Sequence, residues 1–118
     1  VLVEIQDSRS NVIEFDRAMQ LPLDRIAAST ARAFFLTSPN APTGVAFTNA
    51  DLANILAVFP GLLVVDEAYA PFATENAVPL LDSHPRLVVV RGVAGGQQHV
   101  GIAPAFAQGQ VGRLRGTA

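Results

Sequence analysis

The sequence predicts an α/β fold with three layers, in which a mostly parallel sheet is covered by helices on both faces. Short, nearly continuous apolar runs such as Arg32–Thr37 and Leu62–Val65 are typical of strands that are buried on both sides. Segments with the apolar spacing of helices separate these runs. Alternation of strands and helices along a chain indicates repeated βα units around one sheet.

The first elements are predicted within residues 11–37. Asn11–Asp16 (NVIEFD) is short and rich in β-branched and aromatic residues, which favours a strand. Leu21–Ser29 (LPLDRIAAS) combines helix formers with helical spacing of its apolar residues, so we expect a short helix there. Arg32–Thr37 (RAFFLT) then predicts a strand with both faces covered.

A second helix is predicted to begin after Thr48. Threonine is a favoured N-cap, and Asp51, three residues later, completes a capping-box pattern and places a negative charge at the positive end of the helix dipole. The pair Pro60-Gly61 is typical of the residues that end a helix. The apolar run Leu62–Val65 (LLVV) follows as the next buried strand.

The last predicted elements precede a change in composition. Val78–Pro85 (VPLLDSHP) favours a short helical turn, and Arg86–Arg91 (RLVVVR) favours another buried strand. Residues 92–118 are rich in Gly, Gln and Ala without a clear period, and we expect them to be unstructured apart from a weak strand or helix near Ile102–Phe106. The chain thus divides into a domain of residues 1–91 and a divergent tail of residues 92–118.

The composition argues against several classes of function. A net charge of −2 with scattered arginines argues against nucleic acid or an anionic membrane as a partner. The absence of cysteine excludes disulfides and thiolate metal sites. His84 and His99 have no carboxylate or cysteine at ligand spacing, so no metal site is predicted. With no signal-peptide pattern at the start and no apolar run near the ~20 residues that cross a bilayer, we expect a cytoplasmic protein.

The balance of apolar and charged residues predicts that this chain packs against further structure. Half of its residues are hydrophobic and only 15% are charged, which leaves little polar surface for a body of this size. We therefore favour a chain with faces that are meant to be covered over a free-standing domain.

Two polar segments follow consecutive buried strands. Ser38–Gly44 (SPNAPTG) comes after the first, and Asp66–Tyr69 (DEAY) comes after the second. Ligands of open parallel sheets bind outside the carboxyl ends of the strands, where both segments are expected. A carboxylate at the end of an aliphatic run is costly to desolvate unless a cation accepts it, and a protonated ring nitrogen is such a cation. The structural alternative is that Asp66 caps the following turn.

These motifs, in this order and at this spacing, resemble the large domain of the fold-type I aminotransferases that depend on pyridoxal 5′-phosphate. Within that group they are most similar to the histidinol-phosphate aminotransferases, with their S-P-N-N-P-T-G loop and V-D-E-A-Y strand end. The resemblance runs from Val1 to Arg91 and implies a partial large domain in residues 1–91. It implies a parent reaction that moves an amino group from an amino-acid-like phosphate ester to a 2-oxo acid such as 2-oxoglutarate. Members of the family are usually homodimers.

The resemblance assigns cofactor-binding roles to three residues. Asp66 would pair with the pyridinium nitrogen and keep it protonated, so that the ring can act as an electron sink. Tyr69 would donate a hydrogen bond to the phenolic oxygen of the ring. The family's asparagine directly before P-T-G bonds the same oxygen, but alanine stands there as Ala41, and Asn40 is the asparagine that this loop retains.

The largest departure from the family is the lysine that forms a Schiff base with the cofactor. It should lie four residues after the arginine that ends the last strand, a position that Gly95 occupies when counted from Arg91. The serine expected before it is Ala94. The sequence contains no lysine, and a guanidinium stays protonated and cannot form an imine. No catalytic residue is therefore predicted, and the missing groups count against cofactor binding by this chain.

Three hypotheses follow from these residues. The first is a fragment or degenerate member of the aminotransferase family, inactive as this chain. The second is a non-catalytic α/β domain that serves interaction or ligand sensing. The third, an unrelated small α/β protein, ranks last because both motifs would then be coincidental.

Overall fold

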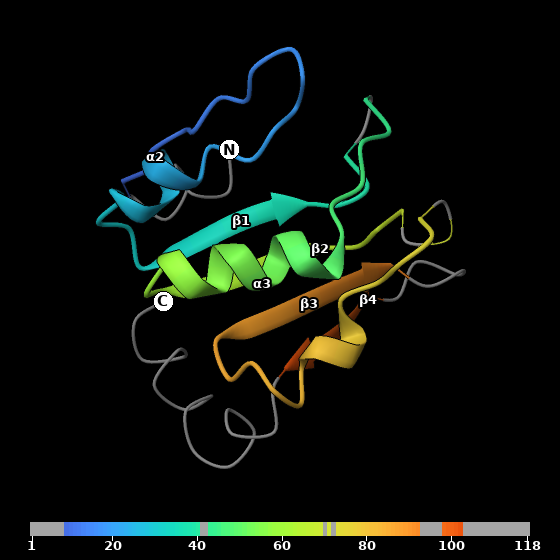
Figure 1. The fold of residues 1–118 in the computed structure, drawn as a ribbon. Coiled ribbons are helices and arrows are strands. Elements are labelled where there is room, and N and C mark those ends of the chain that lie inside the picture. Colours follow the sequence, from blue (N-terminus) through green and yellow to red (C-terminus); the bar gives the residue numbers. More distant parts are fainter. Residues whose placement is uncertain (1–8, 41–42, 70, 72, 93–97, 103–118) are drawn as a thin grey trace.

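The computed structural model describes residues 9–40, 43–69, 71, 73–92 and 98–102 (Figure 1). Its described strands form a four-stranded sheet in the order β1-β2-β3-β4. The strands are β1 (Ala33–Thr37), β2 (Leu62–Asp66), β3 (Leu87–Gly92) and β4 (Gln98–Ile102). The first three are parallel, and β4 is antiparallel to β3. The α/β class and the mostly parallel sheet predicted from the sequence are confirmed.

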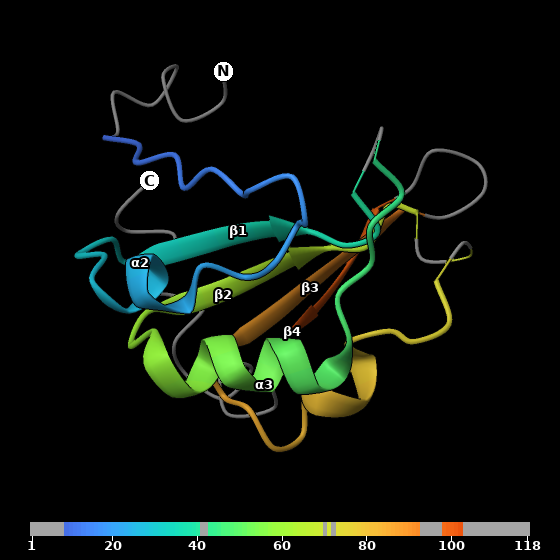
Figure 2. The ribbon, with the colours of Figure 1, turned by 45° about the horizontal axis from the view of Figure 1, so that its top comes forward.

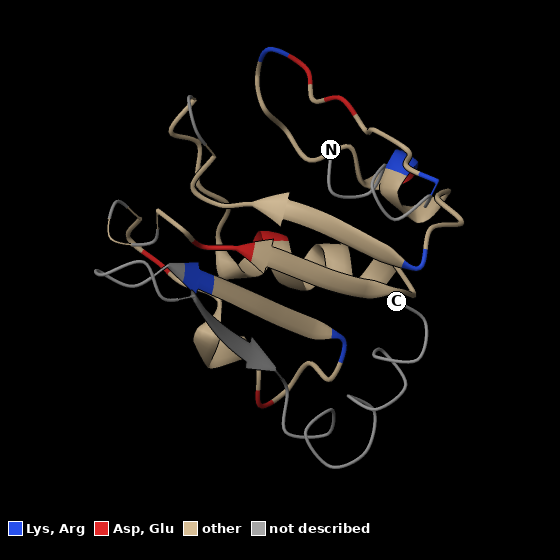
Figure 3. Cartoon of the chain, turned by 180° about the vertical axis from the view of Figure 1, so that it is seen from behind, with Lys and Arg blue, Asp and Glu red and all other residues tan. Residues whose placement is uncertain are grey.

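The described helices lie on one face of this sheet. The long helix α3 (Asn49–Val58) runs along the sheet, the short helix α2 (Leu23–Ala27) packs beside it, and the 3₁₀ helix η2 (Val78–Leu80) lies near its other end (Figure 2). Seen from behind, the sheet stands in front of these helices (Figure 3). The described residues therefore supply one of the two helical layers that the sequence predicts. None of the described helices has the length and apolarity that a membrane crossing requires.

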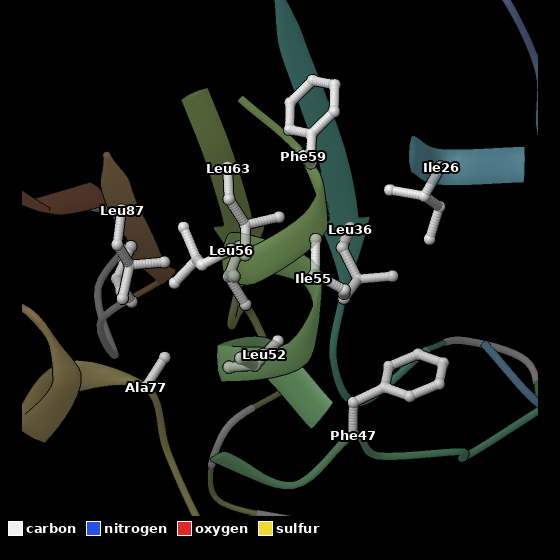
Figure 4. Packing of buried hydrophobic residues seen from close by; sticks show 12 residues of the cluster. Ile26, Leu36, Phe47, Leu52, Ile55, Leu56, Phe59, Leu63, Ala77 and Leu87 are labelled. Carbon is white, nitrogen blue, oxygen red and sulfur yellow. The ribbon is translucent and has the colours of Figure 1, made fainter. Parts of the chain in front are cut away.

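The core lies between α3 and the sheet and follows the alternation of the strands. Leu52, Ile55 and Leu56 form one face of α3 and are almost completely buried against inward-facing strand residues (Figure 4). The cluster contains Ile26, Leu36, Phe47, Leu52, Ile55, Leu56, Phe59, Leu63, Val65, Ala77, Leu87 and Val89. Burying a large aliphatic or aromatic side chain contributes roughly 1.5–3 kcal/mol, so this shared core holds α3 firmly on the strands.

Helix α3 begins and ends at defined contacts. Thr48 Oγ1 accepts a hydrogen bond from the amide of Asp51 (3.1 Å), and the amide of Thr48 donates to Asp51 Oδ2 (2.9 Å). This reciprocal pair is the capping box that the sequence predicts. At the other end the helix stops before Phe59, and the guanidinium of Arg86 donates to backbone carbonyls of that last turn.

The prediction of a strand at Asn11–Asp16 is wrong. This segment has no regular structure, although its alternation is real: Ile13 and Phe15 pack against the core while Val12 is 76% exposed. The ring of Phe15 lies 5.6 Å from that of Phe47. The pattern that suggests a strand therefore arises from an irregular segment that covers the core without pairing with the sheet.

The other boundaries differ by smaller amounts. The helix predicted at Leu21–Ser29 is shortened to α2, since Pro22 stands at its N-cap. The predicted turn at residues 78–85 contains the single 3₁₀ turn η2. The tail of residues 92–118, expected to be unstructured apart from a weak element near Ile102–Phe106, nevertheless contributes β4 to the sheet through residues 98–102. Ala103–Phe106 lie outside the described residues.

Candidate functional site

The two polar segments singled out in the sequence leave the same edge of the sheet. Thr37 and Asp66, the last residues of β1 and β2, are register partners, and Val90, two residues before the end of β3, lies at the same level. Figure 2 shows the loop after β1 and the segment after β2 leaving the sheet at that end. The edge expected to bind ligands thus carries both segments.

Asp66 projects from the face of the sheet opposite to α3. Leu63 and Val65 are completely buried toward the helix, and Asp66, one residue beyond Val65, is exposed, as the alternation of a strand requires. Its Oδ1 accepts a hydrogen bond from the amide of Ala68 at 2.9 Å. The turn-capping role considered for this residue is therefore present, through one carboxylate oxygen.

The peptide unit that joins Asp66 to Glu67 is held from both sides. The carbonyl of Asp66 accepts a hydrogen bond from the amide of Ser38 (3.0 Å), which extends the β1–β2 pairing. The amide of Glu67 donates to the carbonyl of Val90 (2.7 Å), which extends the β2–β3 pairing. These two bonds fix the backbone at the strand end from which Asp66 projects.

Glu67 is a buried carboxylate that the sequence reasoning did not single out. Its side chain is 4% exposed, Oε1 accepts a hydrogen bond from the amide of Ala77, and Oε2 lies 2.8 Å from Nε of Arg91. The charge of Arg91 therefore compensates Glu67. Among the described residues, no cation forms an ion pair with Asp66.

Asn40 is used in closing the loop after β1. Its amide donates to the carbonyl of Val45 (2.8 Å), and its Oδ1 accepts from Thr43 Oγ1 (3.2 Å). Its carbonyl accepts from the amide of Gly44 (2.6 Å), whose φ of 73° is a conformation that favours glycine. Asn40 is half-buried. The side chain thus faces its own loop, where it holds the turn.

Tyr69 lies on the turn after Asp66, with 48% of its surface exposed. The hydrogen bond from the amide of Ser38 to the carbonyl of Asp66 joins the start of the loop that contains Asn40 to the strand end that carries Asp66. Ala41, Ala94 and Gly95, the positions where the sequence departs from the resembled family, lie outside the described residues.

Fold and site together define an α/β domain whose ligand-binding edge carries an exposed acidic strand end and a Pro/Gly-rich loop. A family model described as "Aminotransferase class I and II" matches residues 3–95. The chain belongs to this family, whose members depend on pyridoxal 5′-phosphate. The family recognised from the loop and strand-end motifs is confirmed.

The curated proteins that this chain resembles in sequence include several histidinol-phosphate aminotransferases. The histidinol-phosphate aminotransferase of Nocardia farcinica is 41% identical over 99 residues, which cover 80% of this chain and 24% of that protein. Histidinol-phosphate aminotransferase 3 of Mesorhizobium japonicum is 32% identical over 120 residues, which cover 97% of this chain and 32% of that protein. The chain thus spans between about a quarter and a third of the length of these relatives.

A solved structure shares the fold. YbdL from Escherichia coli, described as having a methionine aminotransferase function, superposes with a TM-score of 0.57 and 19% sequence identity. The match covers 81% of this chain and 30% of that chain. At this identity the likeness establishes the α/β architecture, and the relatives in sequence carry the family assignment.

Proposed function

We propose that this chain is part of a histidinol-phosphate aminotransferase and that it supplies the side of the site facing the ring nitrogen of pyridoxal phosphate. The parent reaction moves an amino group from an amino-acid-like phosphate ester to a 2-oxo acid such as 2-oxoglutarate, in a cytoplasmic homodimer. The names of the relatives support the substrate class. The observation that carries the proposal is the exposed Asp66 at the carboxyl end of β2.

The chemistry of the donor set fits one end of this cofactor. When bound, pyridoxal phosphate supplies an electron sink for bonds at the substrate's α-carbon, provided that its ring nitrogen stays protonated. The carboxylate of Asp66 would hold that proton at the ring nitrogen by charge and hydrogen bonding. Arg91 does not compete for this carboxylate because it is paired with Glu67. Tyr69 and Asn40 are the proposed contacts of the ring edge.

We further propose that these 118 residues do not catalyse transamination by themselves. They contain no lysine, so no side-chain amine is present to hold the cofactor covalently and to move a proton at the substrate. Alanine at position 41 removes one more donor toward the ring. Without these groups, the chain would bind the cofactor weakly and reversibly.

The proposal is tested with pyridoxamine 5′-phosphate, which has no aldehyde and cannot react with the N-terminal amine. We expect saturable binding that Asp66→Asn weakens about tenfold, which corresponds to about 1.4 kcal/mol. The matched control is Asp82→Asn, an exposed carboxylate in the segment that leads into the amino end of β3. Equal affinity of wild type and Asp66→Asn, or an absence of binding by the wild type, would reject the cofactor role.

The proposed inactivity has a separate test. Incubation with pyridoxal 5′-phosphate, reduction with borohydride and peptide mapping should show no cofactor attached to a side chain. The N-terminal amine is the one group expected to react. A reduced adduct on any internal residue would contradict the proposed chemistry.

The non-catalytic interaction domain stays as a second candidate because one face of the sheet exposes apolar residues. Phe35 is 69% exposed at the middle of β1. An absence of pyridoxamine phosphate binding, together with a cooperative unfolding transition in a monomer or defined dimer, would favour this candidate.

A further inference from the structure

We propose that Glu67 is a positioning residue that holds Asp66 on the ligand-binding face of the sheet. This inference rests on the proposed function, since Asp66 matters there as the partner of a ring nitrogen. It concerns an acidic pair, Asp66-Glu67, whose members point to opposite faces of β2 and have opposite degrees of burial. Glu67 would act through Asp66 and would not touch the cofactor.

The first step of the argument is the alternation of side chains at the strand end. Successive residues of a strand point to opposite faces, so the orientation of residue 67 determines that of residue 66. The carbonyl of Asp66 and the amide of Glu67 bond to Ser38 and Val90 on the neighbouring strands. A one-residue shift of this strand end against its neighbours would break both bonds and exchange the faces of the two carboxylates.

The second step is the difference between the two environments. On the helix side, Oε2 of Glu67 meets Nε of Arg91 at 2.8 Å, and Oε1 accepts the amide of Ala77, a completely buried residue. A buried carboxylate is tolerated when it is paired and hydrogen-bonded in this way. Aspartate is one methylene shorter and would reach these partners poorly. Glu67, the longer acid, is therefore held on the buried helix side of the sheet, and Asp66, the shorter acid, is held on the exposed face.

The third step concerns charge. Arg91 lies near the end of β3, one residue beyond Val90, which is the register partner of Asp66. Because Glu67 engages the guanidinium, the negative charge of Asp66 stays available for a ligand. Loss of the Glu67 charge would leave the guanidinium of Arg91 without its partner on the helix side of the sheet.

Amide hydrogen exchange measures the position of Asp66 without any ligand, because the amide of Ala68 donates to Asp66 Oδ1. In the 118-residue chain with Glu67→Gln, we expect the Ala68 amide to exchange about tenfold faster relative to the Leu63 amide, which bonds to the carbonyl of Arg86 inside the sheet. The matched control is Glu75→Gln. Glu75 belongs to the segment that connects β2 and β3 and lines the same pocket as Glu67 and Arg91, but its Oε2 accepts the amide of Asn49 at the start of α3 and not the guanidinium of Arg91.

Two results would overturn the positioning role. One is an unchanged Ala68 amide in Glu67→Gln; the other is equal acceleration of the Ala68 and Leu63 amides, which would mean that Glu67 only stabilises the fold. If Glu67→Gln does not fold, Arg91→Gln removes the same ion pair from the other side. The same local change at Ala68 is expected there, and the same two results would count against the proposal.

Binding of pyridoxamine 5′-phosphate separates this inference from the proposed function. We expect Glu67→Gln to weaken binding severalfold and Glu75→Gln to leave it unchanged. If the wild type does not bind but the Ala68 amide responds, the cofactor role fails and the control of Asp66 by Glu67 stands. If the wild type binds and Asp66→Asn weakens binding while Glu67→Gln leaves both binding and the Ala68 amide unchanged, the cofactor role stands and the positioning role is rejected.

Discussion

Arg86 Nη2 donates a hydrogen bond to the carbonyl of Leu56 across 2.6 Å, and thereby joins the residue before β3 to the last turn of α3. The same guanidinium donates through Nη1 to the carbonyls of Phe59 and Gly61. The last carbonyls of a helix have no partner within it, and a cation at this end also meets the negative end of the helix dipole. One arginine therefore satisfies the end of the helix and the connection that leads into β2.

Replacing Arg86 by methionine should lower the free energy of unfolding by about 1.5–3 kcal/mol, the range for hydrogen bonds that involve a charged group. Methionine keeps most of the apolar stem, so the loss reports on the guanidinium. Urea titration measures the change. Arg17→Met, at an exposed position before α2, is the control and should stay within about 0.5 kcal/mol of wild type. Equal effects of the two changes would mean that the Arg86 contacts contribute nothing.

Gly61 is required by a close approach between backbone segments. A Cβ at this position would lie 2.4 Å from the carbonyl oxygen of Arg32 and 2.8 Å from the ring of Phe59. We expect Gly61→Ala to cost about 1–3 kcal/mol of stability, because the entry to β2 must move away from β1. Thermal unfolding with a denaturant series tests this.

The control for Gly61 is the other glycine that the loop geometry explains. Gly44 has a φ of 73°, and a Cβ added there would meet no atom within 4 Å. Asparagine tolerates this backbone conformation better than most residues. Gly44→Asn should therefore cost less than Gly61→Ala. The reverse order would show that the crowding at Gly61 relaxes without penalty.

Phe35 should promote association between copies of the chain. Its side chain is 69% exposed on the face of the sheet that the described helices leave open (Figure 3). Strands of a parallel sheet are ordinarily covered on both faces, and exposed apolar patches favour association. Phe35→Asn should reduce the concentration-dependent increase in sedimentation coefficient and change the unfolding free energy by less than about 1 kcal/mol.

Val12 provides the comparison for Phe35. It is 76% exposed but lies in the irregular segment before α2, away from the open face of the sheet. Val12→Asn should leave sedimentation unchanged. If both variants, or neither, reduce association, the face around Phe35 is not its cause.

Local signals in the sequence predicted the elements that local interactions define. The capping box of Thr48 and Asp51 marks the start of α3 within one residue, because the two side chains bond each other's amides. The runs that became β1, β2 and β3 are apolar because both faces of a strand favour burial. The prediction of a strand at Asn11–Asp16 was wrong because alternation shows only which side chains turn inward. It does not show whether a neighbouring strand is present to pair with.

The candidate site shows the same division. The position of Asp66 at the carboxyl end of β2 could be predicted from the aliphatic run before it, whereas its cofactor-binding role stays a prediction. The burial of Glu67 could not be predicted, because it depends on Arg91, which is distant in sequence and adjacent only through the register of β2 and β3. The two adjacent acids did carry a usable signal. Neighbouring residues at a strand end point to opposite faces of the sheet, so one of the two carboxylates must be buried and needs a cationic partner.

The hydroxyl of Ser38 accepts the amide of Phe47 at 2.9 Å and closes the base of the loop between β1 and α3. Phe47 is anchored in the core and Thr48 starts the helix, so the scaffold is tied together below the loop. We therefore expect substitutions at the tip of this loop to affect the stability of the fold less than substitutions at Ser38 or Phe47. The residues that this loop presents to a ligand are therefore separate from the contacts that hold the scaffold together.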